Sequence, residues 1–136
     1  MTEKLLDRPA FKAAVFGRDN NCCVICGAPG DAAHHILERK LFEDGGYYLS
    51  NGSTLCAPCH IEAEKTMLSV EDIRTACNIT DPALPRGYLA DRRYDKWGNE
   101  IHEDGTRSRG PLFDDTGARK ILAEAGLLYD GTFGFG

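Results

Sequence analysis

Residues 23–64 read CVICGAPGDAAHHILERKLFEDGGYYLSNGSTLCAPCHIEAE. This stretch holds two Cys-x-x-Cys pairs, two adjacent histidines between them, and a third histidine directly after the second pair. Pairs at this spacing are typical of zinc knuckles, in which four thiolates from two separate turns close one tetrahedral site. The sequence therefore predicts a structural zinc site whose ligands are Cys23, Cys26, Cys56 and Cys59.

The six cysteines also allow a disulfide framework, and the expected compartment decides between the two interpretations. The N-terminal segment carries acidic residues without the apolar run of a signal peptide, and no apolar run approaches the roughly 18 residues of a membrane span. We therefore expect a soluble, cytoplasmic protein with reduced thiols and no membrane contact. Cys22 and Cys77 are then free thiols, and Cys22 is a less usual substitute for Cys23 because it lies one residue further from Cys26.

Length and composition indicate one small domain. The chain has 136 residues, of which 42% are hydrophobic, and this is enough for one modest core. The formal net charge of -5 argues against a protein that coats nucleic acid nonspecifically, because such affinity comes mainly from Lys and Arg. It leaves open an enzyme that grips nucleic acid locally, and the least acidic stretch, residues 85–120, contains several arginines.

Short helices and short strands alternate along the chain, which predicts an α+β fold. Pro9 in a first turn, with Phe11 and Val15 on one face, predicts a helix that ends near Gly17. The other predicted elements are a strand over 32–37, a helix from the second cysteine pair with His60, Ala63, Glu64 and Met67 on one face, a helix capped by Ser69 that turns Val70, Ile73 and Cys77 inward, a hairpin over 94–101 and a helix over 116–125. We expect a single domain over 1–136, with a core at 8–70 and an extension of unknown role at 71–136.

The order of these motifs resembles the HNH endonuclease family. Within residues 8–70 the chain presents Asp31-Ala-Ala-His34-His35, then Gly45-Gly46, then Asn51, and then Cys56-Ala-Pro-Cys59-His60, in the family's order. The resemblance implies a small ββα-metal finger, also called a His-Me finger, with a structural zinc site, flanked here by short helices and a C-terminal hairpin plus helix. It also implies metal-dependent hydrolysis of phosphodiester bonds in nucleic acid, with DNA a more expected substrate than RNA.

The predicted catalytic residues are His35 and Asn51. Phosphodiester hydrolysis needs a base that takes a proton from water, and an imidazole with its ordinary pKa of about 6.5 suits this near neutrality. The resemblance assigns that role to His35. The side-chain oxygen of Asn51 is expected to accept a hydrogen bond from the His35 ring and so to orient it. Taken alone, Asn51 beside Gly52 is more typical of a turn former.

A second, catalytic metal site is also predicted, because a divalent ion stabilises the charge that develops on the leaving oxygen. His34 and His60 are the matching ligand positions. Since successive side chains of a strand face opposite ways, we expect different roles for His34 and His35. Glu64 lies one helical turn after His60 and is either a third ligand or part of a solvated helix face. A carboxylate ligand favours Mg or Mn, with Ni or Zn as alternatives.

Further interpretations stay open at this stage. Arg39 and Lys40 follow the first predicted strand and are candidate contacts for substrate phosphates, although such charges commonly only solubilise a surface. A noncatalytic zinc-ribbon module that binds nucleic acid or protein needs the cysteines alone and leaves the histidines and Asn51 unexplained. A zinc deaminase needs a His-x-Glu element, whereas the sequence offers His35-Ile-Leu-Glu38, which is one residue too long.

Overall fold

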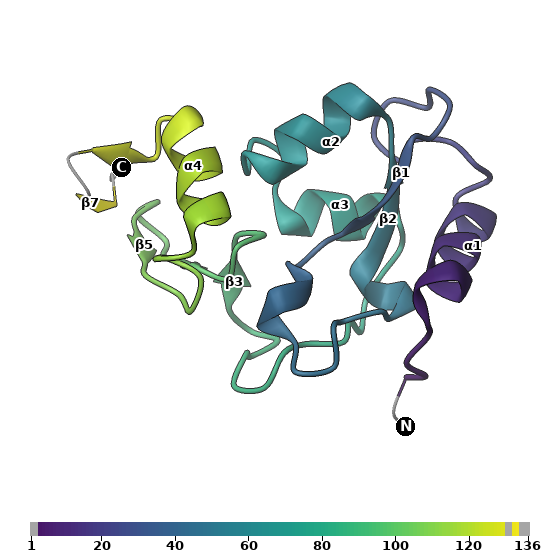
Figure 1. Ribbon diagram of the computed structural model, residues 1–136, viewed down its shortest axis with the longest axis horizontal. Helices are drawn as coiled ribbons and strands as arrows, with labels where there is room; N and C mark the ends of the chain where they lie inside the picture. Colours follow the sequence, from purple (N-terminus) through teal and green to yellow (C-terminus); the bar gives the residue numbers. More distant parts are fainter. Residues whose placement is uncertain (1–2, 130–131, 134–136) are drawn as a thin grey trace.

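The computed structural model describes residues 3–129 and 132–133 of the chain (Figure 1). Helices alternate with short antiparallel strands, so the predicted α+β class is confirmed. Two further segments, η1 and η2, are short 3-10 helices. In chain order the elements are α1 (Arg8–Arg18), β1 (Ala32–His35), η1 (Arg39–Leu41), η2 (Leu49–Asn51), β2 (Gly52–Leu55), α2 (Ala57–Glu64), α3 (Val70–Ala76), β3 (Arg93–Tyr94), β4 (Glu100–Ile101), β5 (Arg107–Ser108), α4 (Thr116–Glu124), β6 (Leu128–Tyr129) and β7 (Thr132–Phe133).

Helix α1 forms as predicted and packs on the strand pair that follows it. The Asp7 side chain caps the helix by accepting a hydrogen bond from a first-turn N–H at 2.8 Å. Phe11 and Val15 are buried on the face turned to β1 and β2. Gly52 permits this close packing, because a Cβ atom there would lie 2.4 Å from a methyl group of Val15 and 2.8 Å from the Phe11 ring.

Strands β1 and β2 pair antiparallel, and β1 ends with His34 and His35. The two side chains face opposite ways, as strand geometry requires. The His34 ring contacts a ring on α2, whereas the His35 ring contacts α1. The strand is shorter than the predicted span of 32–37, because the backbone of Leu37 pairs with the side chain of Asn51 instead of with a neighbouring strand.

Helix α2 follows β2 directly, so that strand, strand and helix succeed one another along the chain. It ends at Glu64, and Thr66 then adopts a left-handed conformation with a φ of 61°. The prediction that Met67 continues the face of this helix formed by His60, Ala63 and Glu64 is wrong, because Met67 comes after the helix end and is 66% exposed. The next helix, α3, is capped as predicted: the Ser69 hydroxyl accepts a hydrogen bond from the Asp72 N–H at 2.9 Å.

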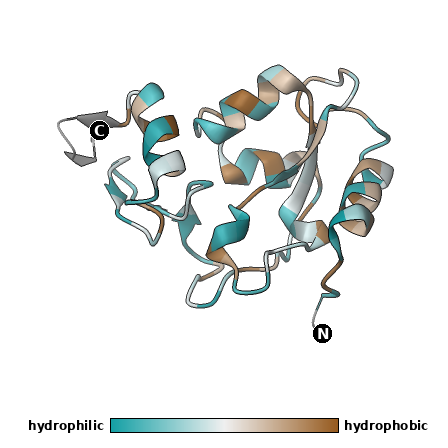
Figure 2. Ribbon diagram, in the orientation of Figure 1, coloured by the Kyte–Doolittle hydropathy of each residue, from teal (hydrophilic) through white to brown (hydrophobic). Residues whose placement is uncertain are grey.

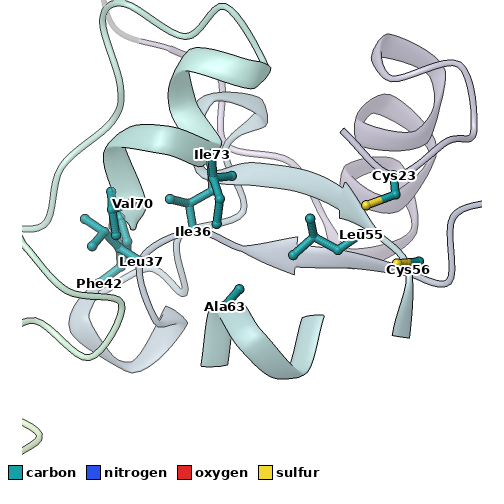
Figure 3. Close-up of a cluster of buried hydrophobic side chains, with 9 residues drawn as sticks. All are labelled: Cys23, Ile36, Leu37, Phe42, Leu55, Cys56, Ala63, Val70 and Ile73. Atoms are coloured by element: carbon teal, nitrogen blue, oxygen red, sulfur yellow. The ribbon is translucent and has the colours of Figure 1, made fainter. Parts of the chain in front are cut away.

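The main hydrophobic core joins β2, α2 and α3 (Figure 3). Val70 and Ile73 of α3 lie in this cluster with Ile36 and Leu37, which directly follow β1. Ile73 belongs to this cluster although the predicted core segment, 8–70, ends before it. The cluster therefore includes residues of both predicted segments. Its buried members are Cys23, Ile36, Leu37, Phe42, Leu55, Cys56, Ala63, Val70 and Ile73.

The later part of the chain forms a three-stranded sheet in the order β3-β4-β5 and the helix α4. The hairpin predicted over 94–101 is confirmed as β3 and β4, and β5 is a third strand that was not predicted. Helix α4 carries hydrophobic and hydrophilic residues side by side (Figure 2) and buries Ala118 and Leu122 against Trp97. No helix in the described part of the chain combines the length and the apolar character that a membrane crossing requires.

Candidate metal centres

Four cysteines meet where two turns approach each other. Their Sγ atoms all lie within 4.8 Å of one another, and those of Cys26 and Cys56 are 3.6 Å apart. In the first turn Gly27 donates its N–H to the Cys23 carbonyl at 2.9 Å, with a φ of 82° that favours glycine. In the second, Cys56 precedes α2 and Cys59 lies in its first turn. These four cysteines, predicted from their spacing, form a cluster that can hold a metal ion.

The thiols of this cluster differ in their preference for charge. Burial by itself raises the pKa of Cys23, but hydrogen bonds from backbone N–H groups of Cys26 and Cys56 outweigh it and lower the pKa to about 6. Burial and the neighbouring thiols raise the pKa of Cys59. Thiolates packed so closely repel one another, and a divalent cation among them removes that repulsion. Four thiolates leave a tetrahedral ion no open position, so this cluster suits a structural ion.

A second group of metal-ligating atoms lies between β1 and α2. It consists of His34, His60 and Glu64, each of which offers one ligand atom within 4.8 Å of the other two. The rings of His34 and His60 meet edge to face with centroids 5.0 Å apart. One turn further along α2, Oε1 of Glu64 lies 3.3 Å from Nε2 of His60. The side chain of His34 on β1 and those of His60 and Glu64 on α2 thus bring their ligand atoms together.

The surroundings of His34 fit a metal ligand. The side chain is buried, and neither ring nitrogen has a hydrogen-bond partner among residues 3–129 and 132–133. Burial, and after it the positive charge of Lys96, hold the pKa of His34 well below its usual range, so the ring is neutral at pH 7. A buried polar group without a partner costs about 1–3 kcal/mol. A cation bound to one ring nitrogen would supply the missing partner.

His35 projects from the opposite face of β1 into an aromatic setting. Its ring stacks on Phe11 with centroids 4.6 Å apart, and the ring of Tyr47 meets it edge-on at 4.9 Å. Burial, followed by the charges of Lys96 and Arg39, lowers the pKa of His35 to about 4. The imidazole is therefore neutral at pH 7, but it is a weaker base than a histidine with the ordinary pKa of about 6.5.

The side chain of Asn51 has other hydrogen-bond partners than the sequence predicted. It was expected to accept a hydrogen bond from the His35 ring, but its Oδ1 accepts from the Leu37 N–H at 2.9 Å. Its Nδ2 donates to the carbonyls of Leu37 at 3.0 Å and Gly46 at 3.3 Å. The predicted contact is wrong, because the fully buried amide of Asn51 makes its hydrogen bonds with backbone groups of Leu37 and Gly46. Asn51 instead fixes the long connection between the strands.

One pocket of about 730 Å³ joins the two faces of β1. His34, His35, His60 and Glu64 all contribute to its lining, and basic residues stand around them: Arg8, Lys12, Arg39 and Lys96. Lys40, which was predicted beside Arg39 as a substrate contact, is not part of this lining and pairs with Asp115 at 3.2 Å. Arg8 and Lys12 were missed, although their spacing of one helical turn on α1 would have placed them on one helix face.

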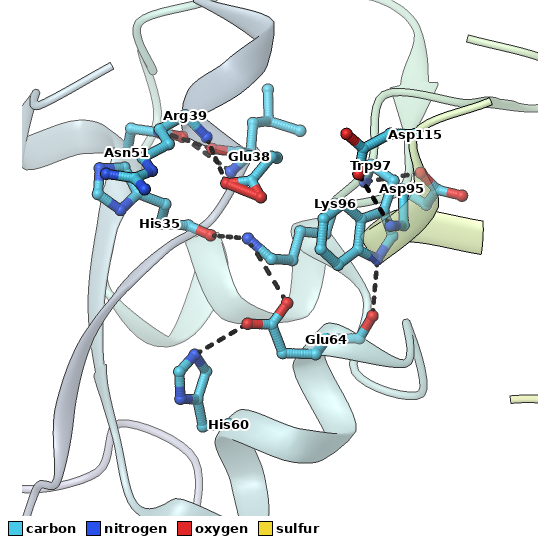
Figure 4. Close-up of polar contacts among 12 residues, drawn as sticks. His35, Glu38, Arg39, Asn51, His60, Glu64, Asp95, Lys96, Trp97 and Asp115 are labelled. Atoms are coloured by element: carbon cyan, nitrogen blue, oxygen red, sulfur yellow. Dashed lines mark hydrogen bonds and ion pairs between the residues drawn. The ribbon is translucent and has the colours of Figure 1, made fainter. Parts of the chain in front are cut away.

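Lys96 is the residue that sequence reasoning could not find. It lies in the turn between β3 and β4, and its side chain is only 5% exposed. Its Nζ donates to the carbonyl of His35 at 3.0 Å and lies 3.8 Å from Oε2 of Glu64 (Figure 4). Next to it, the indole of Trp97 donates to the backbone carbonyl of Glu64 at 2.8 Å. The later part of the chain therefore contributes directly to this pocket.

Comparisons with models of known families, with curated proteins and with solved structures found no match to this chain. The likeness of its motif order to the HNH family thus rests on the residues of the segment 8–70 alone and stays a prediction. What the chain can do is judged from the chemistry of the two ligand clusters and of the pocket.

Proposed function

We propose that this protein is a metal-dependent endonuclease of the HNH type, which hydrolyses phosphodiester bonds of nucleic acid. The proposal rests on two adjacent histidines of β1 that face opposite ways and line the same pocket. His34 faces two further ligand-type side chains, while His35 presents a neutral imidazole to the same pocket. The DNA preference is proposed from the family resemblance only. A cytoplasmic setting is proposed from the sequence composition.

The proposed mechanism assigns the proton transfer to His35. Its neutral imidazole accepts a proton from a water molecule as that water attacks the phosphorus, and the bond from phosphorus to the leaving oxygen breaks. Stacking on Phe11 fixes the plane of the ring, and Asn51 fixes the backbone that follows. General-base catalysis of this kind contributes typically 10² to 10⁴ in rate, an order-of-magnitude range.

The proposed second ion belongs to His34, His60 and Glu64. A divalent cation bound there would stabilise the negative charge on the leaving oxygen and on a nonbridging oxygen. Two imidazoles and one carboxylate form a ligand set that accepts Mg, Mn, Ni or Zn, and the carboxylate favours Mg or Mn. Three protein ligands leave positions for water and substrate, in contrast to the four-cysteine cluster, which we propose holds a structural zinc ion.

The pocket lining holds basic residues that can attract a polyanionic substrate despite the net charge of -5. It also holds three acidic residues, Asp31, Glu38 and Glu64. Arg8 and Lys12 on α1, together with Arg39, border the pocket on the side of His35. Such residues attract phosphates locally and make the affinity dependent on salt. Base-specific contacts are not needed for this attraction.

A noncatalytic zinc module is the second candidate, and the four-cysteine cluster by itself fits it equally well. That module requires nothing of the pocket, however, and gives no reason for His34, His60 and Glu64 to converge there while both ring nitrogens of His34 stay unpaired. The two candidates differ in one measurable property, which is cleavage.

The decisive experiment is a cleavage assay on protein treated with EDTA until only tightly bound zinc is left. Single- and double-stranded DNA and RNA are each tested with Mg, Mn, Ni and Zn. We expect added ions to restore cleavage, and we expect His35→Ala to lose roughly 10² to 10⁴ in rate with zinc content unchanged. The matched control is His102→Ala, at a histidine that directly follows β4 and whose side chain is 41% exposed. Nucleic-acid binding without cleavage under every ion would favour the noncatalytic module.

A further inference from the structure

Lys96 lies in a turn that a network of hydrogen bonds around the buried Asp95 stabilises. Asp95 is buried, and its Oδ1 accepts hydrogen bonds from the backbone N–H groups of Trp97 at 2.9 Å and Asn99 at 3.0 Å. Its other oxygen accepts from Arg107 at 2.8 Å. The indole of Trp97 packs in the hydrophobic cluster with α4. The turn therefore presents the Lys96 side chain at one fixed position.

The Lys96 ammonium meets two groups of the proposed catalytic site. One of its N–H groups donates to the carbonyl of His35 at 3.0 Å, and Nζ lies 3.8 Å from Oε2 of Glu64. The Lys96 backbone carbonyl also accepts a hydrogen bond from the Glu38 N–H at 2.9 Å. A buried ammonium is costly unless it is paired, so these contacts define where its charge lies.

The two oxygens of Glu64 have different surroundings (Figure 4). Oε1 faces the Nε2 atom of His60 at 3.3 Å and is thus directed to the second ligand cluster. Oε2 is buried and has no hydrogen-bond partner in the described part of the chain, and the cation nearest to it in the ion pairs is Lys96. One carboxylate is thus divided between the ligand cluster and the lysine.

We propose that Lys96 is a positioning residue that keeps Oε2 of Glu64 away from the catalytic ion, so that Glu64 binds through a single oxygen. This inference rests on the proposed function of His34, His60 and Glu64 as ligands. Binding through one oxygen leaves a coordination position that a substrate phosphate or water can occupy. Lys96 lies in the part of the chain after α3, which has no other assigned role. Through Lys96 this part keeps one coordination position of the metal ion free for substrate or water.

The inference predicts opposite effects on metal binding and on cleavage. In Lys96→Met the stem of the side chain still packs, but Glu64 is free to bind the ion with both oxygens. We expect Mn to bind about tenfold more tightly, a typical coupling between adjacent groups, and cleavage at saturating Mn to slow at least about tenfold. A lysine that only stabilised the fold would weaken Mn binding and cleavage together. Lys120→Met, an exposed lysine on α4, controls for the general loss of one positive charge.

Mn binding is measured by electron paramagnetic resonance on the zinc-loaded full chain, in the wild type and in variants at both positions. In a Glu64→Gln background the tightening caused by Lys96→Met should disappear, because no second carboxylate oxygen is present. Glu62→Gln, on the exposed part of the same helix, should leave the tightening intact. Tightening that persists with Glu64→Gln would mean plain charge repulsion and would overturn the positioning role.

Two further measurements distinguish a failure of the proposed metal site from a failure of the positioning role of Lys96. Wild-type protein that binds no Mn, or binds it equally well with His34→Ala, would refute the proposed metal site itself. Wild-type protein that binds Mn through His34, with Lys96→Met unchanged in affinity, would refute this inference alone. If Lys96→Met lacks zinc or folded structure, Lys96→Gln takes its place, since it can still donate to the His35 carbonyl but has no charge, and the same tightening is expected.

Discussion

The imidazole of His35 lies parallel to the phenyl ring of Phe11, with centroids 4.6 Å apart and an angle of 19° between the planes. Phe11 comes from α1 and His35 from the end of β1, and Gly52 on the neighbouring strand leaves room for the pair. Helix α1 is thus part of the setting of the proposed base. Packing against Phe11 and Tyr47 partly buries the ring, and this burial lowers its pKa.

We expect His35 to stay neutral far below the usual range of histidine. Burial, and then the charges of Lys96 and Arg39, place its pKa at about 4, against 6.5 for an ordinary histidine. The basic form is therefore fully present at pH 7 and is lost only as the pH falls through about 4. Ring resonances followed by NMR during an acid titration measure this directly. A midpoint for His35 near 6.5 would contradict the burial of the ring.

The same shift affects stability. Between pH 6.5 and about 4 the unfolded chain binds a proton at His35 that the folded chain does not, so the free energy of unfolding should fall as the pH is lowered through this window. His35→Phe keeps an aromatic ring beside Phe11 but cannot titrate. Urea unfolding at several pH values should show a smaller acid loss for this variant, and equal slopes for the two proteins would argue against the prediction. Any acid release of the proposed zinc ion is measured in both proteins as a control.

Asn51→Ala should act first on stability. The substitution removes three hydrogen bonds from a fully buried position and leaves backbone groups of Leu37 without their partners. The Leu37 N–H and carbonyl each cost about 1–3 kcal/mol when left without a partner, so we expect the free energy of unfolding to drop by about 2–6 kcal/mol. Urea denaturation measures the loss. Unchanged stability together with lost cleavage would instead assign Asn51 a direct part in the reaction.

Cys59→Ser should release the proposed structural zinc ion. A structural site contributes to folding directly, so the loss of one of four ligands should lower the Tm by roughly 10 °C or more. Metal analysis and thermal unfolding test this together. Cys22→Ser is the matched control, because Cys22 is an exposed thiol outside the cluster. Equal zinc content in both variants would show that Cys59 is not a ligand.

Much of the fold could be predicted because its signals are local. The cap at Ser69, the turn glycines and the periodic apolar residues of α1 each act within one or two turns of chain, and these elements form as expected. The end of α2 was missed, since the left-handed Thr66 leaves no signal in residue type. The third strand, β5, was also missed, although it is as long as β3 and β4, because the turn signal of Asp104 and Gly105 before it was not used.

The sequence by itself determined which ligand atoms are available and how neighbours among them are oriented. Two Cys-x-x-Cys turns, a His and a Glu one helical turn apart, and two histidines on opposite faces of a strand follow from local geometry. Only the tertiary structure decided that the Asn51 amide binds the backbone of Leu37, and that Lys96 reaches the carbonyl of His35 across 61 positions of chain. Such contacts depend on how separate elements pack, here on Trp97 against α4 and on the buried Asp95, and no short-range pattern encodes that packing.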